Sequence, residues 1–147
     1  MINLGIYLPH LGDKTLLEQC LKEINRGKEN NLISDASIFF DNIGVIDTPV
    51  SCGLFNSTDL WNFRGKLLML SVDCAIKTLN IINDIDMFFG YGWGDKNVFA
   101  TLSVVGHSKV KTICRNKELE DDFYRLTGKN SVGYSENLEG VIELMAN

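Results

Sequence analysis

The chain is short of several features that would narrow its function. It has two prolines, two histidines and no apolar run that approaches the roughly 20 residues needed to cross a bilayer. A basic segment is also missing, because the 14 Lys and Arg residues are scattered and outnumbered by 19 Asp and Glu residues, for a net charge of -5. These absences predict no nucleic-acid partner and no membrane partner.

Clustered cysteines are missing too. The four cysteines (Cys20, Cys52, Cys74 and Cys114) are far apart, form no C-x-x-C pair and have only two histidines to join them at a metal. This spacing predicts separate, reduced, largely buried thiols, with no disulfide and no metal. Because a strand-like segment opens the chain, where a basic and apolar signal segment would stand, we expect a soluble, cytoplasmic protein.

The sequence also lacks the signatures that many α/β proteins carry. The dinucleotide-binding pattern G-x-G-x-x-G, the P-loop pattern G-x-x-x-x-G-K-[ST] and the nucleophile pattern G-x-S-x-G are all absent. A response-regulator receiver needs paired acids after its first strand and a lysine after a late one, where this chain offers His10 and Arg115. We therefore assign no catalytic residue and no cofactor from the sequence.

What the chain does have is a regular alternation of apolar runs with polar clusters and helix-period segments. The six runs are Ile2–Leu8, Ala36–Phe40, Cys52–Phe55, Leu67–Val72, Ile85–Tyr91 and Val110–Cys114. Strands and helices in alternation indicate a parallel sheet covered on both faces, with the nearly continuous apolar run Leu67–Val72 as a central strand. The 147 residues, 45% of them apolar, predict a single α/β domain over residues 1–147. It is expected to be doubly wound in three layers, with a mainly parallel sheet of about 5–6 strands, flavodoxin-like or Rossmann-like.

Local signals predict where elements begin and end. Pro9 is expected to end the first strand, and Asp13 to cap a helix that Gly27 and the polar residues after it stop. Asn116 is expected to cap a later helix, with Gly128 in the left-handed position at its end. The three glycines within residues 90–94 predict a flexible segment after the fifth strand.

Parallel strands bring their carboxyl ends to one edge of the sheet, where ligands bind in folds of this class. The residues that follow the predicted strands include His10, Asp41, Asn56, Ser57, Thr58, Asp59, Ser71, Asp73, Trp93, Asp95, Arg115, Asn116 and Glu136. One interpretation is that most of them cap helix amino ends and need no ligand. The other is that the same helix ends bind anions, and the two interpretations are compatible in one crevice.

Two side chains at this edge carry chemistry of their own. Arg115 directly follows a buried strand and opens a helix, so its guanidinium is placed to hold a phosphate or carboxylate in two hydrogen bonds. The alternative for Arg115 is a salt bridge to a neighbouring carboxylate. His10 follows the first strand and is a candidate acid or base near neutral pH.

Aromatic residues gather in two of the segments at this edge, 55–61 and 91–94, which contain Trp61 and Trp93. Two such residues can hold a flat ring between them, or can simply close the edges of the core. The arrangement resembles flavodoxin, whose flavin lies between aromatics of two loops that follow strands. The resemblance stops at the first loop, because flavodoxin has many Ser, Thr and Gly residues there, whereas Pro9–Thr15 has few.

The last third of the chain, from Val110 onward, is similar in outline to the nucleotide-binding half of two-domain sugar transferases. The shared outline is a strand ending in a basic residue, a helix, a short strand and an acid at a helix start. The resemblance implies that Arg115 would neutralise a diphosphate and that Glu136 would hold a ribose.

Taken together, these features predict a small binding protein for a nucleotide or another small anionic ligand at the carboxyl ends of the strands. The expected ligand-binding residues are Arg115, Asn56, Ser57, Thr58, Asp59, Trp93, His10 and Glu136. The alternatives are a non-catalytic protein-interaction module and a nucleotide-sugar-transferase-like fragment. Convergence of Arg115, Asp59 and Trp93 on one pocket would favour the ligand, whereas a filled edge would favour the module. The sequence leaves a homo-oligomer open.

Overall fold

The computed structural model describes residues 1–81, 84–94 and 97–147. The strands are β1 (Ile2–His10), β2 (Ile33–Asn42), β3 (Gly53–Asn56), β4 (Gly65–Met69), β5 (Ile85–Tyr91), β6 (Val110–Cys114) and β7 (Gly133–Tyr134). The helices are α1 (Lys14–Glu29), the 3-10 helix η1 (Ser57–Asn62), α2 (Val72–Leu79), α3 (Val98–Val105), α4 (Lys117–Thr127), the short η2 (Glu136–Leu138) and α5 (Val141–Ala146). Asp95, one of the expected edge residues, lies outside the described residues.

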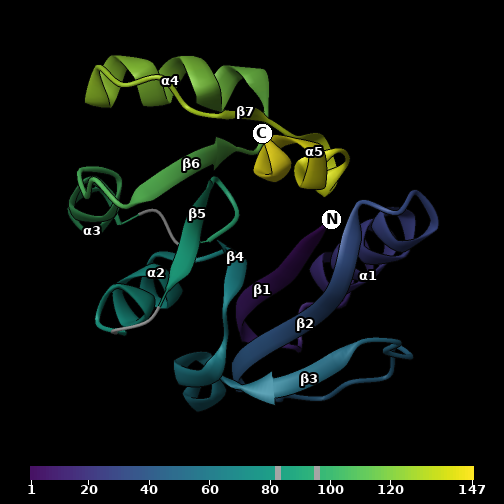
Figure 1. Cartoon of the computed structure of the whole chain (residues 1–147). Coiled ribbons are helices and arrows are strands. Elements are labelled where there is room, and N and C mark those ends of the chain that lie inside the picture. Colours follow the sequence, from purple (N-terminus) through teal and green to yellow (C-terminus); the bar gives the residue numbers. More distant parts are fainter. Residues whose placement is uncertain (82–83, 95–96) are drawn as a thin grey trace.

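All the described strands are parallel and form one sheet in the order β3-β2-β1-β4-β5-β6-β7. Figure 1 shows β3 near one end of the molecule and α4 at the other. The predicted parallel sheet is confirmed, with seven strands where about 5–6 were expected, because residues 133–134 add a two-residue strand at the edge. β4 lies fourth of the seven, which confirms the central position predicted for this run.

Side chains that alternate along each strand build a core on both faces of the sheet. On β1, Ile6 and Leu8 join a core cluster with residues of α1 and α5, and we call this side the α1 face. Tyr7 joins a second cluster with residues of α2, α3 and α4, on what we call the α2 face. Leu68 and Met69 of β4 are fully buried on opposite faces. The predicted covering of both faces is therefore confirmed.

Pro9 does not end the first strand, contrary to expectation. β1 continues to His10, which lies opposite Asn42 of β2. The Tyr7 carbonyl accepts a hydrogen bond from the Leu70 N–H, so alternate residues of β1 point their backbone groups toward β4. The last β4 residue paired with β1 is Met69, so Pro9 lies beyond that pairing, at a position where its missing N–H breaks no ladder bond.

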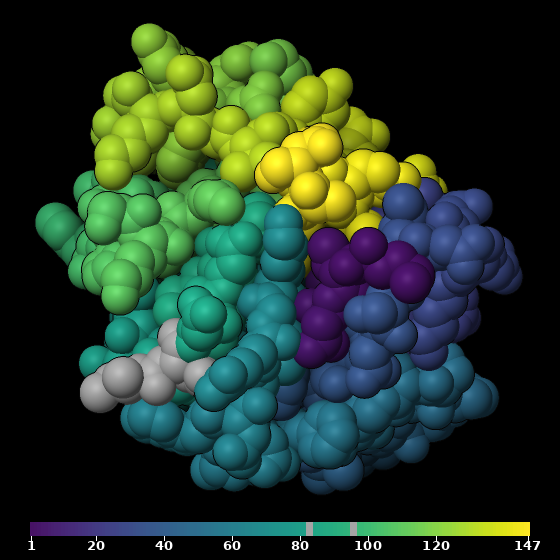
Figure 2. Space-filling model, in the orientation of Figure 1, coloured from purple at the N-terminus to yellow at the C-terminus, as the bar shows by residue number. Residues whose placement is uncertain are grey.

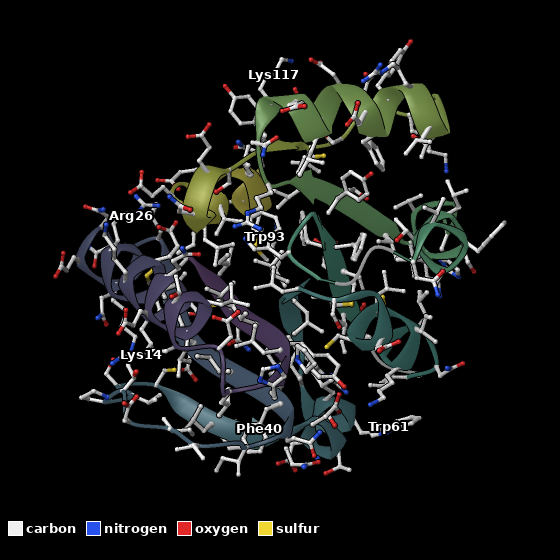
Figure 3. The ribbon with its side chains drawn as sticks, turned by 180° about the vertical axis from the view of Figure 1, so that it is seen from behind. Lys14, Arg26, Phe40, Trp61, Trp93 and Lys117 are labelled. Atoms are coloured by element: carbon white, nitrogen blue, oxygen red, sulfur yellow. The ribbon has the colours of Figure 1, made fainter. Side chains whose placement is uncertain are left out.

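Gly27 lies inside α1 and does not stop it. A Cβ atom at Gly27 would lie 2.5 Å from Cδ1 of Ile142, so this glycine lets α5 pack closely against α1. The two helices are also joined by Arg26, which donates hydrogen bonds to both Glu23 and Glu143 and lies beside α5 in Figure 3. In Figure 2 the C-terminal residues, in yellow, lie directly beside the N-terminal residues, in purple.

The predicted helix caps, the predicted left-handed glycine and the predicted free thiols agree with the structure. Asp13 accepts a hydrogen bond from the Leu16 N–H at the start of α1, and Asn116 accepts one from the Leu119 N–H at the start of α4. Gly128 ends α4 with a φ of 69°, in the left-handed region. All four cysteines are free thiols; Cys52 is half-buried and the others are buried. Among the described helices, none has the length and apolar character that a membrane span requires.

Candidate functional site

The strand order divides the expected site residues between the two ends of the carboxyl edge. The Asn56–Asp59 segment follows β3, whereas Arg115 follows β6. Five strand spacings separate these two positions, or roughly 24 Å at about 4.8 Å per strand. Arg115 and Asp59 therefore do not converge on one pocket. Trp93 follows β5 and lies nearer to Arg115.

The centre of the edge, between β1 and β4, is filled. In parallel sheets of this kind the strand order reverses between these two strands, and ligands commonly bind at that point. Here Leu11 and Leu70 are buried in the core cluster of the α1 face, and the Trp93 ring packs against the same cluster. A Cβ atom at Gly90 would lie 2.8 Å from Cε3 of Trp93, so the glycine makes room for the indole. Core side chains thus occupy the place of a ligand.

Beside this point, on the α2 face, a polar network joins β1, β2 and α2. The Tyr7 hydroxyl donates to Oδ1 of Asp41 at 2.7 Å, and Nζ of Lys77 lies 2.9 Å from Oδ2 of the same carboxylate. Burial raises the pKa of Asp41, but hydrogen bonds from Ser57, Tyr7 and Lys77 outweigh it and hold that pKa below its usual value. Burial and the bond to Asp41 together raise the pKa of Tyr7. Asp41 is therefore an ionised carboxylate that is already fully partnered.

Two of the expected edge residues, Asp41 in this network and His10 in the loop after β1, have protein groups as partners. In dinucleotide-binding folds an acid near this position holds a ribose hydroxyl, but Asp41 directs its two oxygens to protein groups. His10 is exposed, and its Nδ1 accepts a hydrogen bond from the Gly12 N–H at 3.1 Å within a tight turn. Both residues lie at the ends of β1 and β2, three or more strands away from Arg115 on β6.

The other half of the edge contains an open, mainly apolar hollow. A cavity of about 240 Å³, which we call the β5 cavity, lies where β5 ends, between α3 and α4. Its walls are formed by Val72, Phe89, Gly90, Tyr91, Gly92, Gly94, Val98, Thr101, Leu102, Leu119, Asp122 and Leu126. The sequence predicted this edge but not this hollow, because its walls come from residues spread over positions 72–126.

The glycines after β5 allow close packing. Gly92 has a φ of 108°, and a Cβ atom there would lie 2.5 Å from Cδ1 of Leu119. A Cβ atom at Gly94 would lie 3.0 Å from the backbone of Ser71. The segment therefore lies tightly against the starts of α2 and α4, while the Trp93 side chain points to the opposite face. This packing forms one wall of the β5 cavity.

Few polar groups face the β5 cavity from the described residues. Asp122 forms an ion pair with Arg125, and Thr101 adds a hydroxyl. Tyr91 also lines the cavity, and burial raises the pKa of its hydroxyl. An acceptor and two hydroxyls in an apolar wall are typical of sites that fix the orientation of a ring-shaped ligand.

Arg115 lies at the rim of this cavity. Its Nη1 donates to the Gly92 carbonyl at 3.2 Å, and Gly92 and Leu119, which both line the cavity, lie beside it. The expected alternative, a salt bridge to a carboxylate, is not formed among the described residues, and Arg115 is exposed. Glu136 is exposed at the start of η2, directly after β7, the strand next to β6.

The two tryptophans do not face one ring. Trp61 lies on η1 after β3, and Trp93 follows β5, four strand spacings away in the sheet. Figure 3 shows the two labelled side chains well apart. The aromatic arrangement implied by the flavodoxin resemblance is therefore absent between these two residues.

No match to this chain was found among protein-family models, curated proteins or solved structures. Within residues 1–81, 84–94 and 97–147, no group of three or more His, Cys, Asp or Glu side chains is arranged to hold a metal ion.

Proposed function

We propose that the protein binds a small ligand made of a flat ring and one anionic group, of the nucleoside monophosphate class, at the β5 cavity. The observation that carries this proposal is the apolar cavity with Arg115 at its rim, whose guanidinium has no carboxylate partner among the described residues. The proposed set of ligand-binding residues is thus smaller than the set that the sequence predicts. Arg115 stays in it, whereas His10 and the Asn56–Asp59 segment do not.

The cavity suits the ring of such a ligand. Its volume is just below the range of about 300–1,000 Å³ that is usual for whole-ligand pockets, so it fits one ring system better than a complete large ligand. Tyr91, Leu102 and Leu126 supply aromatic and apolar contact. The Asp122 carboxylate is available to accept a hydrogen bond from a ring N–H or amino group.

The rim suits a single anionic group. Arg115 has five N–H donors, and the Gly92 carbonyl takes one of them. Glu118 and Glu120 stand in the first turn of α4, directly beyond Arg115. These carboxylates repel further negative charge, so one phosphate is favoured over a chain of phosphates.

Calorimetric titration tests the proposal with AMP and UMP, each paired with its uncharged nucleoside. We expect a monophosphate to bind and its nucleoside to bind less tightly. Arg115→Ala should weaken monophosphate binding by about 10- to 100-fold, the usual worth of a hydrogen bond to a charged group. Lys117→Ala is the matched control, since Lys117 is a nearby cation engaged with Glu120 and Asp121. Leu102→Trp should block the cavity.

Two outcomes would contradict this function. One is that nothing binds at millimolar concentration, and the other is that Arg115→Ala and Lys117→Ala weaken binding equally. A nucleotide sugar that binds much more tightly than either monophosphate, with Glu136→Ala removing the gain, would instead favour the transferase-like fragment.

A second candidate function, a protein-interaction module, is favoured by the exposed apolar surface of α3. Val98, Phe99 and Leu102 are 54%, 87% and 38% exposed, and α3 has no charged residue. Exposed apolar groups gathered on one helix are typical of interaction sites. Sedimentation of the wild type and of Phe99→Ser tests this function, because self-association lost in the variant would favour it.

A further inference from the structure

A second hollow lies at the opposite end of the sheet, beside β3 and η1. Its volume is about 290 Å³, and it is lined by Ser37, Phe39, Phe55, Asp59, Asn62 and Phe63. We call it the Phe cup. It adjoins the Asn56–Asp59 segment that the sequence singled out and that the proposed function leaves unused. Four strand spacings, roughly 19 Å, separate β3 from β5 and its cavity.

Three aromatic rings form the wall of the Phe cup. The Phe39 ring centre lies 5.2 Å from that of Phe63, with the ring planes at 71°, and 6.0 Å from that of Phe55, with the planes at 34°. Phe39 and Phe63 are buried and belong to the core cluster of the α2 face, whereas Phe55 is 43% exposed. Phe39 and Phe63 are only 3% and 7% exposed, so they form the floor of the hollow, and Phe55 on the edge strand supplies most of its accessible aromatic surface.

The positions of these rings follow from the sheet. Phe39 of β2 lies directly opposite Phe55 of β3 in the parallel register, so both rings project from the same face. Gly5 of β1 provides the space behind them, because a Cβ atom there would lie 2.9 Å from Cζ of Phe63 and 3.2 Å from Cε2 of Phe39. The shape of the Phe cup therefore follows from the pairing of β2 with β3 and from the space left at Gly5.

A carboxylate completes the cup. Asp59 is exposed on η1, two residues after Ser57, and forms no ion pair or hydrogen bond within the described part of the chain. Asp41 differs from Asp59 in this respect. Its two oxygens are bonded to Tyr7 and Lys77, and Ser57 adds a further hydrogen bond. Asp59 is thus an exposed carboxyl group, without an ion pair among the described residues, beside the aromatic rings of the cup.

We propose that the Phe cup binds an organic ammonium ion of the methylated-amine class, such as the trimethylammonium group of choline. Aromatic faces attract cations through their quadrupole, and bulky methylated ammonium groups are the ligands that aromatic cups of this kind accept. A nearby carboxylate adds direct charge attraction and favours a cation over a neutral apolar group of equal size. This site is separate from the β5 cavity and does not depend on the proposed function.

Choline and its uncharged isostere 3,3-dimethylbutan-1-ol are the probes that separate charge from shape. Each is titrated into the ¹⁵N-labelled chain at constant ionic strength, and amide shifts are followed by NMR. We expect choline to shift the amides of residues 37–39 and 53–63. The isostere should bind about fivefold or more weakly.

Matched variants test the two parts of the cup. Phe55→Ala and Asp59→Asn should each weaken choline binding by about fivefold, and both change exposed side chains, so the fold should be kept. Phe99→Ala and Asp121→Asn make the same changes at exposed positions on α3 and α4 and should have no effect. The proposal is overturned if choline produces no shifts at 20 mM, if the isostere binds equally well, or if the control variants weaken binding as much.

Discussion

The two halves of the carboxyl edge use the same strand ends in different ways. On the β1–β2 half, the side chains of Tyr7, Asp41 and Lys77 use one another as partners. On the β5–β6 half, glycines and apolar side chains leave the β5 cavity, with Arg115 held at its rim by a backbone carbonyl. A polar residue at a strand end is therefore a poor guide to a site unless its partners are known.

The difference has a simple physical origin. The Tyr7 hydroxyl is buried, and a buried hydroxyl without a partner is costly, so the chain places a carboxylate beside it. The walls of the β5 cavity carry few such groups, so they can surround empty space without leaving a buried donor unsatisfied. The side chains of the first half are engaged with one another, whereas the second half leaves a cavity open.

The largest expected effect is a difference in stability between variants of the buried centre of the sheet and variants of the half that contains the β5 cavity. Leu68→Asp places a carboxylate inside β4, among the apolar side chains of the core cluster on the α1 face, and should destabilise the protein by more than about 4 kcal/mol. Leu102→Asp makes the same change on α3 at the cavity rim and should cost about 1 kcal/mol or less. Thermal unfolding followed by circular dichroism measures both.

Unfolding of Leu102→Asp would show that the exposed apolar surface of α3 supports the fold, and the comparison of the two halves would fail. Normal stability of Leu68→Asp would contradict the central burial of β4. A wild-type-like melting curve for Leu102→Asp, together with an unfolded Leu68→Asp, is the expected pair of results.

The second prediction compares one carboxylate from each half. Asp41→Ala removes the acceptor of the buried Tyr7 hydroxyl and should lower the free energy of unfolding by about 1–3 kcal/mol. Asp122→Ala removes a surface ion pair with Arg125 and should lower it by about 0.5 kcal/mol or less. Urea denaturation gives both values, and equal losses would remove the distinction between the halves.

Most of the fold could be predicted from the sequence, because the period of apolar residues and the caps at Asp13 and Asn116 are local signals. The strand order is different, since it depends on contacts between residues far apart. The sequence placed Arg115 and the Asn56–Asp59 segment at one edge but could not show that five strand spacings separate them.

Close approaches at glycines could not be predicted from the sequence. Gly27 lies inside α1 and does not stop it, and Gly27, Gly92 and Gly94 each leave space for a side chain or for backbone from a distant segment. Such close approaches have no signal in a single sequence, because the partner that needs the space is not a neighbour. The walls of the β5 cavity were missed for the same reason.

The smallest expected effect is a pH dependence specific to the polar half. The pKa of Asp41 is lower in the folded state than in the unfolded state, so between the two pKa values the unfolded chain binds more protons. The stability that Asp41 contributes is therefore complete above the pKa of Asp41 in the unfolded chain, about 3.9. It is lost as the pH falls through the pKa of Asp41 in the folded state. Asp41→Asn removes this titration and should reduce the fall in stability between pH 6 and pH 3.

Tyr7→Phe should act in the same direction but less strongly, because Lys77 and Ser57 still lower the pKa of Asp41. Urea midpoints at the two pH values measure the difference, and an undiminished fall in Asp41→Asn would contradict an ionised, partnered Asp41.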